Sequence, residues 1–174
     1  MELSTGGAKG ADLEFARASH EANVAVNVFT FPRHHIASYF EYDRTTRGMA
    51  STADIANAAS RLGRNPPSKP YVRNLIARNL ALADYVDSMY AIAPISGDSV
   101  QGGTAWACER FKSRFDRAAP LYVFDGDWYQ WNQGWCKSTP PKSKGKFGSV
   151  GSRNLSVTGK TSGIYSMCAT VTEW

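Results

Sequence analysis

Two glycine-rich turns are the stretches of this sequence with the clearest chemistry. The first is Gly6-Gly7-Ala8-Lys9-Gly10-Ala11-Asp12, and the second is Gly102-Gly103-Thr104. A glycine turn that opens a helix gathers backbone N–H groups and the positive end of the helix dipole at one point, which suits an anion. The sequence therefore predicts a phosphate site, whose expected ligand-binding residues are Gly6, Gly7, Gly10, Gly102, Gly103 and Thr104.

Three charged residues have types that hydrolytic chemistry on a phosphate-bearing ligand uses. A carboxylate can activate water or stabilise a developing cation, and a cation can fix the phosphate. Asp12, Glu109 and Arg78 are the corresponding candidate catalytic residues. Asn79 lies within the apolar stripe of the same expected helix as Arg78, so both are expected near the interior or a cleft.

Each of these residues also has a structural interpretation that stays open. Asp12 would complement a helix dipole, and Glu109 would be a solvated glutamate paired with Arg110 or Lys112. Arg78 would be a surface arginine with a buried stem, and Asn79 a hydrogen-bonded buried amide.

The segment after Asp125 is rich in tryptophan and then in lysine. Trp128 is a candidate for stacking on a nucleobase, and packing of the tryptophans in a core or lid is the alternative. Arg153 is a candidate for completing an anion pocket from a basic lid, and a solvated loop is the alternative for that stretch. Contact with a nucleic-acid backbone is a further, less favoured interpretation of this basic stretch, which contains Lys137, Lys142, Lys144, Lys146, Arg153 and Lys160.

The elements that must position these residues alternate between strands and helices. Strands are expected at 2–5, 24–31, 88–94 and 121–125, and helices at 11–21, 53–62, 71–87 and 104–117. This order predicts an α/β fold, a Rossmann-like three-layer sandwich with a mainly parallel sheet, and ligands at the carboxyl ends of its strands. One domain over 1–174 is expected, with a core at about 1–125, a polar excursion at 43–70 and an irregular, Trp-rich, basic C-terminal extension at 126–174.

Composition limits the partners. The net charge of +5 and pI near 9.2 allow an anionic ligand without requiring nucleic acid. No signal peptide and no apolar run of about 20 residues is present, and the three separated cysteines are expected to be reduced, so a cytoplasmic protein without membrane contact is predicted. No cofactor is expected, and no metal, because His20, His34 and His35 have no cysteine or carboxylate at ligand spacing.

Four segments together resemble the SLOG superfamily of Rossmann-like domains. They are GGAKGAD after the first strand, the Arg78-Asn79 pair before VDSMYAIAP, GGT at the next helix, and PLYVFD. The superfamily includes the Lonely Guy phosphoribohydrolases, the DNA-processing protein DprA, molybdenum-cofactor carriers and sensors of nucleotide-derived signals in bacterial defence. The resemblance covers about 2–125, and a bacterial and phage subgroup also shares the Trp-Tyr segment and a stretch like Gly148 to Arg153.

The resemblance implies a nucleotide-derived ligand, homo-oligomerisation and a catalytic role for Arg78. Lonely Guy enzymes read P-G-G-x-G-T-x-x-E, whereas here an insertion from Ile95 to Gln101 follows Pro94, and Glu109 comes about one helical turn late. The expected function is therefore nucleotide binding, with N-glycosidic hydrolysis as an open possibility. The alternatives are a sensor or an anti-defence phage sponge for a cyclic dinucleotide or ADP-ribose derivative, in the host cytoplasm if phage-encoded, and a DNA-binding accessory protein.

Overall fold

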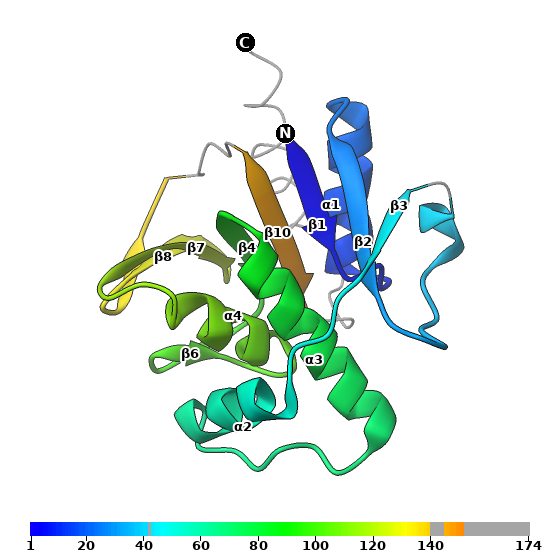
Figure 1. The fold of residues 1–174 in the computed structure, drawn as a ribbon. Coiled ribbons are helices and arrows are strands. Elements are labelled where there is room, and N and C mark those ends of the chain that lie inside the picture. The colour runs from blue at the N-terminus through cyan, green and yellow to red at the C-terminus, as the bar shows by residue number, and fades with distance from the viewer. Residues whose placement is uncertain (42, 140–144, 152–174) are drawn as a thin grey trace.

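An eight-stranded, mostly parallel sheet forms the centre of the molecule (Figure 1). The structure is a computed structural model that describes residues 1–41, 43–139 and 145–151. The strands lie in the order β3-β2-β1-β10-β4-β7-β8-β9, and within this described sheet the pairs β7–β8 and β8–β9 are antiparallel while the others are parallel. Their bounds are β1 (Glu2–Thr5), β2 (Ala25–Thr30), β3 (Arg44–Arg47), β4 (Ser88–Ile92), β7 (Ala118–Phe124), β8 (Trp128–Asn132), β9 (Trp135–Lys137) and β10 (Lys146–Gly151).

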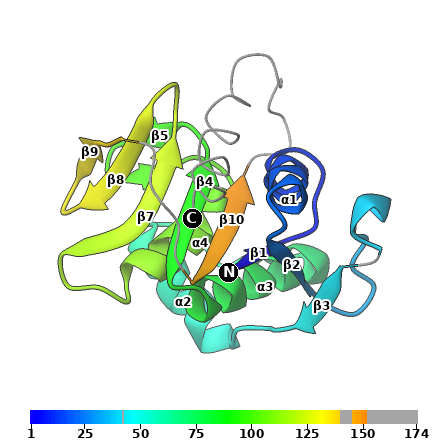
Figure 2. The same ribbon diagram turned by 90° about the horizontal axis from the view of Figure 1, so that it is seen from above.

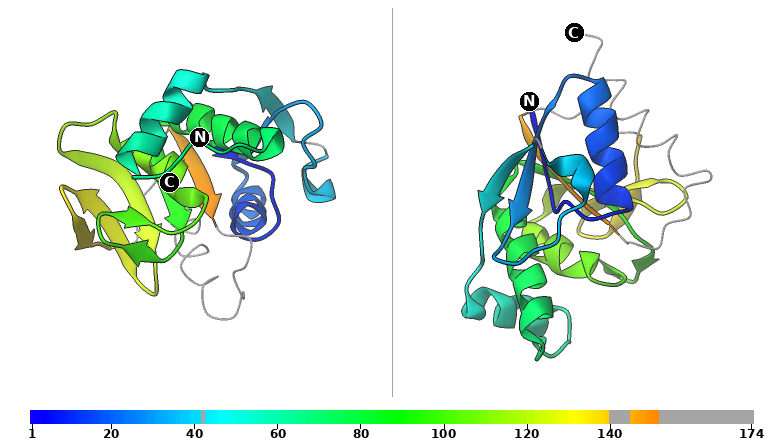
Figure 3. Two further views of the ribbon diagram at one scale, coloured as in Figure 1. Left: turned by 90° about the horizontal axis from the view of Figure 1, so that it is seen from below. Right: turned by 90° about the vertical axis from the view of Figure 1, so that its right-hand side faces the viewer.

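Helices cover both faces of the sheet, which gives three layers (Figures 2 and 3). On one face α1 (Ala11–Glu21) packs its buried side, including Phe15, against Leu3 and Phe147 of the strands. On the other face lie α3 (Pro70–Tyr85) and α4 (Thr104–Lys112), and α2 (Thr52–Arg61) packs on these two helices. The predicted α/β sandwich with a mainly parallel sheet is therefore confirmed. None of the helices in the described ranges is long and apolar enough to cross a bilayer.

Local patterns explain the helices and strands that were predicted. The apolar spacing of α3 places Ile76, Leu80 and Ala83 on its buried side, and Pro70 stands at its start, where the missing N–H is harmless. The strand β4 is buried along its whole length, as expected for a parallel strand covered on both faces. The insertion from Ile95 to Gln101 forms a small hairpin of β5 (Ile95–Ser96) and β6 (Ser99–Val100) between β4 and α4.

The segment expected to be an irregular extension instead supplies three strands of the sheet. One of them, β10, lies between β1 and β4 and pairs in parallel with both. Phe147 is buried on the α1 face, and a Cβ added to Gly148 would lie 2.8 Å from Leu82 on the opposite face. Small residues in β10 thus let α3 approach closely, and the core includes residues 146–151 as well as 1–125.

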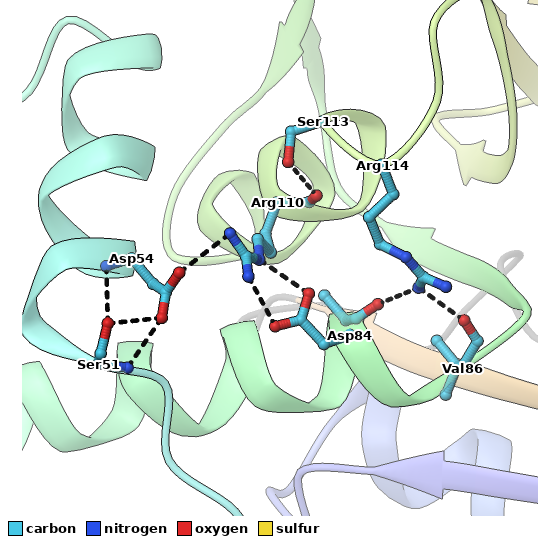
Figure 4. A network of polar contacts seen from close by, with 8 residues as sticks. Ser51, Asp54, Asp84, Val86, Arg110, Ser113 and Arg114 are labelled. Atoms are coloured by element: carbon cyan, nitrogen blue, oxygen red, sulfur yellow. Dashed lines mark hydrogen bonds and ion pairs between the residues drawn. The ribbon is translucent and has the colours of Figure 1, made fainter.

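The polar excursion is attached to the body of the protein through α2 (Figure 4). Ser51 caps this helix in a capping box with Asp54. Arg110 of α4 forms ion pairs with Asp54 of α2, at 3.2 Å, and with Asp84 of α3, at 2.8 Å. One arginine therefore joins three helices and ties the first turn of α2 to α3 and α4.

Candidate functional site

A cavity of about 550 Å³ lies at the carboxyl edge of the sheet. On one side of β1 lie β2 and β3, and on its other side, beyond β10, lie β4 and β7. The direction in which successive strands are added to the sheet therefore reverses at β10. Ligands of open α/β sheets bind at such a reversal. The cavity is lined by Ala8, Asp12, Arg64, Val72, Leu75, Ile76, Arg78, Asn79, Gln101, Gly102, Gly103, Thr104, Trp106, Val150 and Gly151.

Arg78 of α3 is a buried cation in this cavity. Arg78 is only 4% exposed, and the next residue of the helix, Asn79, is half-buried. A Cβ added to Gly6 would lie 1.5 Å from Nη1 of Arg78 and 2.8 Å from Oδ2 of Asp12. Gly6 therefore leaves the space that the guanidinium occupies, and any side chain at position 6 would displace it.

Asp12 lies in the first turn of α1 and is 6% exposed. Its Oδ2 accepts a hydrogen bond from the backbone N–H of Ala8 at 3.2 Å. Burial raises the pKa of Asp12 above its ordinary value of 3.8, and this loss of hydration outweighs the opposing effect of the nearby Arg78 guanidinium. A carboxyl group that retains its proton to higher pH thus faces the cavity beside a fixed positive charge.

The raised pKa of Asp12 predicts a pH-dependent gain in stability for Asp12→Asn. Because the folded protein holds this proton more tightly than the unfolded chain, the wild-type free energy of unfolding falls as pH rises from about 4 through the folded-state pKa. We expect the stability of Asp12→Asn relative to wild type to increase over this window, by up to about 1.4 kcal/mol per pH unit, and then to level off. Urea denaturation of both proteins from pH 3.5 to 8 measures it. A difference that is flat, or that shrinks with pH, would contradict the assignment.

The second glycine turn forms the opposite wall. Gly102 has a φ of +73°, a conformation that favours glycine, and Gly103 is the N-cap of α4. Since Gly103 has no side chain, no side-chain acceptor caps the first N–H groups of α4. Thr104 is buried behind them. Arg64, from the loop after α2, donates through Nη1 to the carbonyl oxygen of Gly102 at 3.0 Å.

The structure brings together most of the site residues predicted from the sequence. Six of them line this cavity: Asp12, Arg78, Asn79, Gly102, Gly103 and Thr104. Gly6 lies directly against Arg78 and Asp12. Gly7 and Gly10 have φ values of +69° and +90° and shape the first turn, but they are not among the lining residues.

Two predicted site residues are placed elsewhere. Glu109 is 7% exposed and accepts from Nε of Arg61 at 3.1 Å, and it pairs with Nζ of Lys112 at 2.7 Å, in a neighbouring cavity. Trp128 is 4% exposed and packs in the core against Tyr90 and Phe124, which is the core alternative. Arg153 lies outside the described residues.

Several lining residues were not singled out from the sequence. Arg64 belongs to the polar excursion, which was treated as peripheral, and only the tertiary placement of α2 brings it to the turn. Gln101 directly precedes the glycine turn, and that adjacency was an available signal. Val150 and Gly151 reach the cavity because β10 is central, which no local pattern indicated.

Comparison of the chain with models of protein families, with curated proteins and with solved structures found no match.

Proposed function

We propose that this protein binds a nucleotide or nucleotide-derived small molecule, with a phosphate group held in the cavity between Arg78 and the start of α4. The observation that carries the proposal is the buried guanidinium of Arg78, which lines the same cavity as the uncapped turn Gly102-Gly103-Thr104. A fixed cation and a helix N-terminus that share one cavity both favour an anion. Their position at the reversal of strand order supports the same conclusion.

The rest of the cavity suits a nucleoside. Val72, Leu75, Ile76 and Trp106 form its apolar wall, and Asn79 adds an amide that can donate and accept hydrogen bonds. The volume of about 550 Å³ falls within the usual range for small-molecule sites, about 300 to 1,000 Å³. The apolar wall would contact the face of a base or sugar, and the charged and glycine-turn side would contact the phosphate.

Hydrolysis of the N-glycosidic bond of the same ligand is a second candidate function, favoured by Asp12. A buried carboxyl group with a raised pKa, lining the cavity, is suited to donate a proton to the departing base. In that reaction the bond between sugar and base breaks, the base gains the proton of the Asp12 carboxyl, and water adds to the sugar carbon and returns a proton to Asp12. Glu109 has no part in this proposal because Arg61 and Lys112 hold its carboxylate in the neighbouring cavity.

Isothermal titration calorimetry with AMP, GMP, CMP and UMP tests the proposal. We expect at least one of the four to bind, and inorganic phosphate to compete with it. Chromatography of the same mixtures then separates the two candidates, because released base identifies an enzyme, whereas binding without release identifies a sensor or a sponge. Failure of all four nucleotides and of phosphate to bind, together with salt-sensitive binding of single-stranded DNA, would replace this proposal with a nucleic-acid role.

A further inference from the structure

A second cavity, of about 680 Å³, lies next to the first. The hairpin β5–β6, the end of α2, α4 and β8 form it, so the insertion between β4 and α4 builds one of its walls. Arg64, Gln101 and Gly102 line both cavities. The two spaces therefore meet at the second glycine turn, where the first cavity would hold a phosphate.

The lining of the second cavity is polar and held in place. Lys112 donates from Nζ to the carbonyl oxygen of Asp98 at 2.7 Å, pairs with Glu109 at 2.7 Å, and lies 4.0 Å from the ring centre of Trp131. Because Lys112 is only 8% exposed, these contacts fix the floor of the cavity. Hydroxyl, carboxylate and amide groups surround it, from Ser96, Asp98, Ser99, Gln101 and Glu109. Such a lining matches the hydroxyl groups of a sugar.

Arg64 supplies an available charge at the junction of the cavities. Its guanidinium donates to the carbonyl oxygen of Gly102 at 3.0 Å, and within the described part of the chain it forms no ion pair with a carboxylate. The residue is exposed, so its charge is solvated until a ligand arrives. Arg61, by contrast, is already paired with Glu109. A second phosphate beside Gly102 would meet Arg64 directly.

We propose that the natural ligand has two parts joined through a diphosphate, of the class of nucleoside diphosphate sugars. The nucleoside lies in the first cavity, the diphosphate lies along Gly102 between Arg78 and Arg64, and the sugar lies in the second cavity. The inference rests on the proposed nucleotide site and adds the second subsite to it.

Calorimetry with matched ligands and variants tests this inference. The ligands are AMP, GMP, CMP and UMP and the corresponding ADP-, GDP-, CDP- and UDP-glucose. Ser96→Trp fills the second cavity from an exposed position, and Ser60→Trp is the matched control on the exposed side of α2, away from both linings. Arg64→Gln removes the junction charge. Circular dichroism confirms that each variant is folded.

For the wild type we expect the sugar conjugate of the preferred base to bind at least about tenfold tighter than the monophosphate. Ser96→Trp should remove this gain and leave the monophosphate unchanged, Ser60→Trp should alter neither, and Arg64→Gln should weaken the conjugate more than the monophosphate. Equal affinity of the two ligands for the wild type, or a gain that survives Ser96→Trp and Arg64→Gln, would overturn the second subsite and leave the nucleotide site standing. Absence of binding by all eight compounds would overturn both.

Discussion

Replacing Arg78 with methionine is expected to weaken nucleotide binding by about tenfold to a hundredfold in affinity. Methionine keeps much of the side-chain volume and removes the charge. A hydrogen bond to a charged group contributes about 1.5–3 kcal/mol, and the cavity offers the phosphate no other cation as deeply buried as Arg78 among the residues that line it. Calorimetry with the preferred nucleoside monophosphate measures the effect.

A control on the same helix separates loss of the site from a general effect on charge. Arg73→Met removes an exposed arginine of α3 that lines neither cavity and, among the described residues, donates to the carbonyl oxygens of Pro67 and Ser68. We expect its affinity to match wild type. Because Arg78→Met leaves the carboxyl of Asp12 buried beside an apolar group, Arg78→Met/Asp12→Asn is the variant for judging stability. Full binding by folded Arg78→Met would refute the phosphate role.

Replacing Phe147 with alanine is expected to lower the free energy of unfolding by about 3–5 kcal/mol. Phe147 is 1% exposed in the central strand β10, and its ring centre lies 5.8 Å from that of Tyr90 in an edge-on arrangement. The neighbouring strands on both sides leave little room for the structure to collapse into the vacated space. Urea denaturation followed by tryptophan fluorescence measures the loss.

The adjacent residue of β10 provides the control for Phe147. Lys146 is exposed, and its Nζ lies 4.3 Å from the ring centre of Tyr85. Since an exposed contact of this kind contributes about 0.5–1 kcal/mol, Lys146→Ala should cost no more than that. Equal losses of unfolding free energy for Phe147→Ala and Lys146→Ala would mean that the side chain of Phe147 is not part of the hydrophobic core.

Elements with strong local signals could be predicted from the sequence, and β10 could not. The apolar stripe of α3 and the apolar run of β4 each indicate a helix or a strand from the residues of that segment alone. In contrast, β10 reads KFGSVG, half of it glycine and serine, after a run of lysine and proline. Its burial depends on Leu82 and Val86, which pack over Gly148 from a helix more than 60 residues earlier in the chain. Only tertiary contact makes such a segment a central strand.

The candidate site shows the same division between local and distant signals. The glycine turns and Arg78 could be found because each stands at a recognisable point of a strand or helix. The role of Glu109 depended on which cations reach it, and Arg61 comes from a helix 48 residues away in the sequence. Arg64 reaches Gly102 across 38 residues for the same reason. Residues on a polar loop give no indication in the sequence of the cavity that they line.

The central position of a strand so late in the chain also orders events during synthesis. Until residues 146–151 leave the ribosome, β1 and β4 each present an unpaired parallel edge, and the halves that carry Asp12 and Thr104 have no strand between them. Open edges of this kind attract other chains. Until then two incomplete sheets expose open edges, and the cavity lined by Asp12 and Thr104 gains the part of its wall made by Val150 and Gly151 only when β10 joins them.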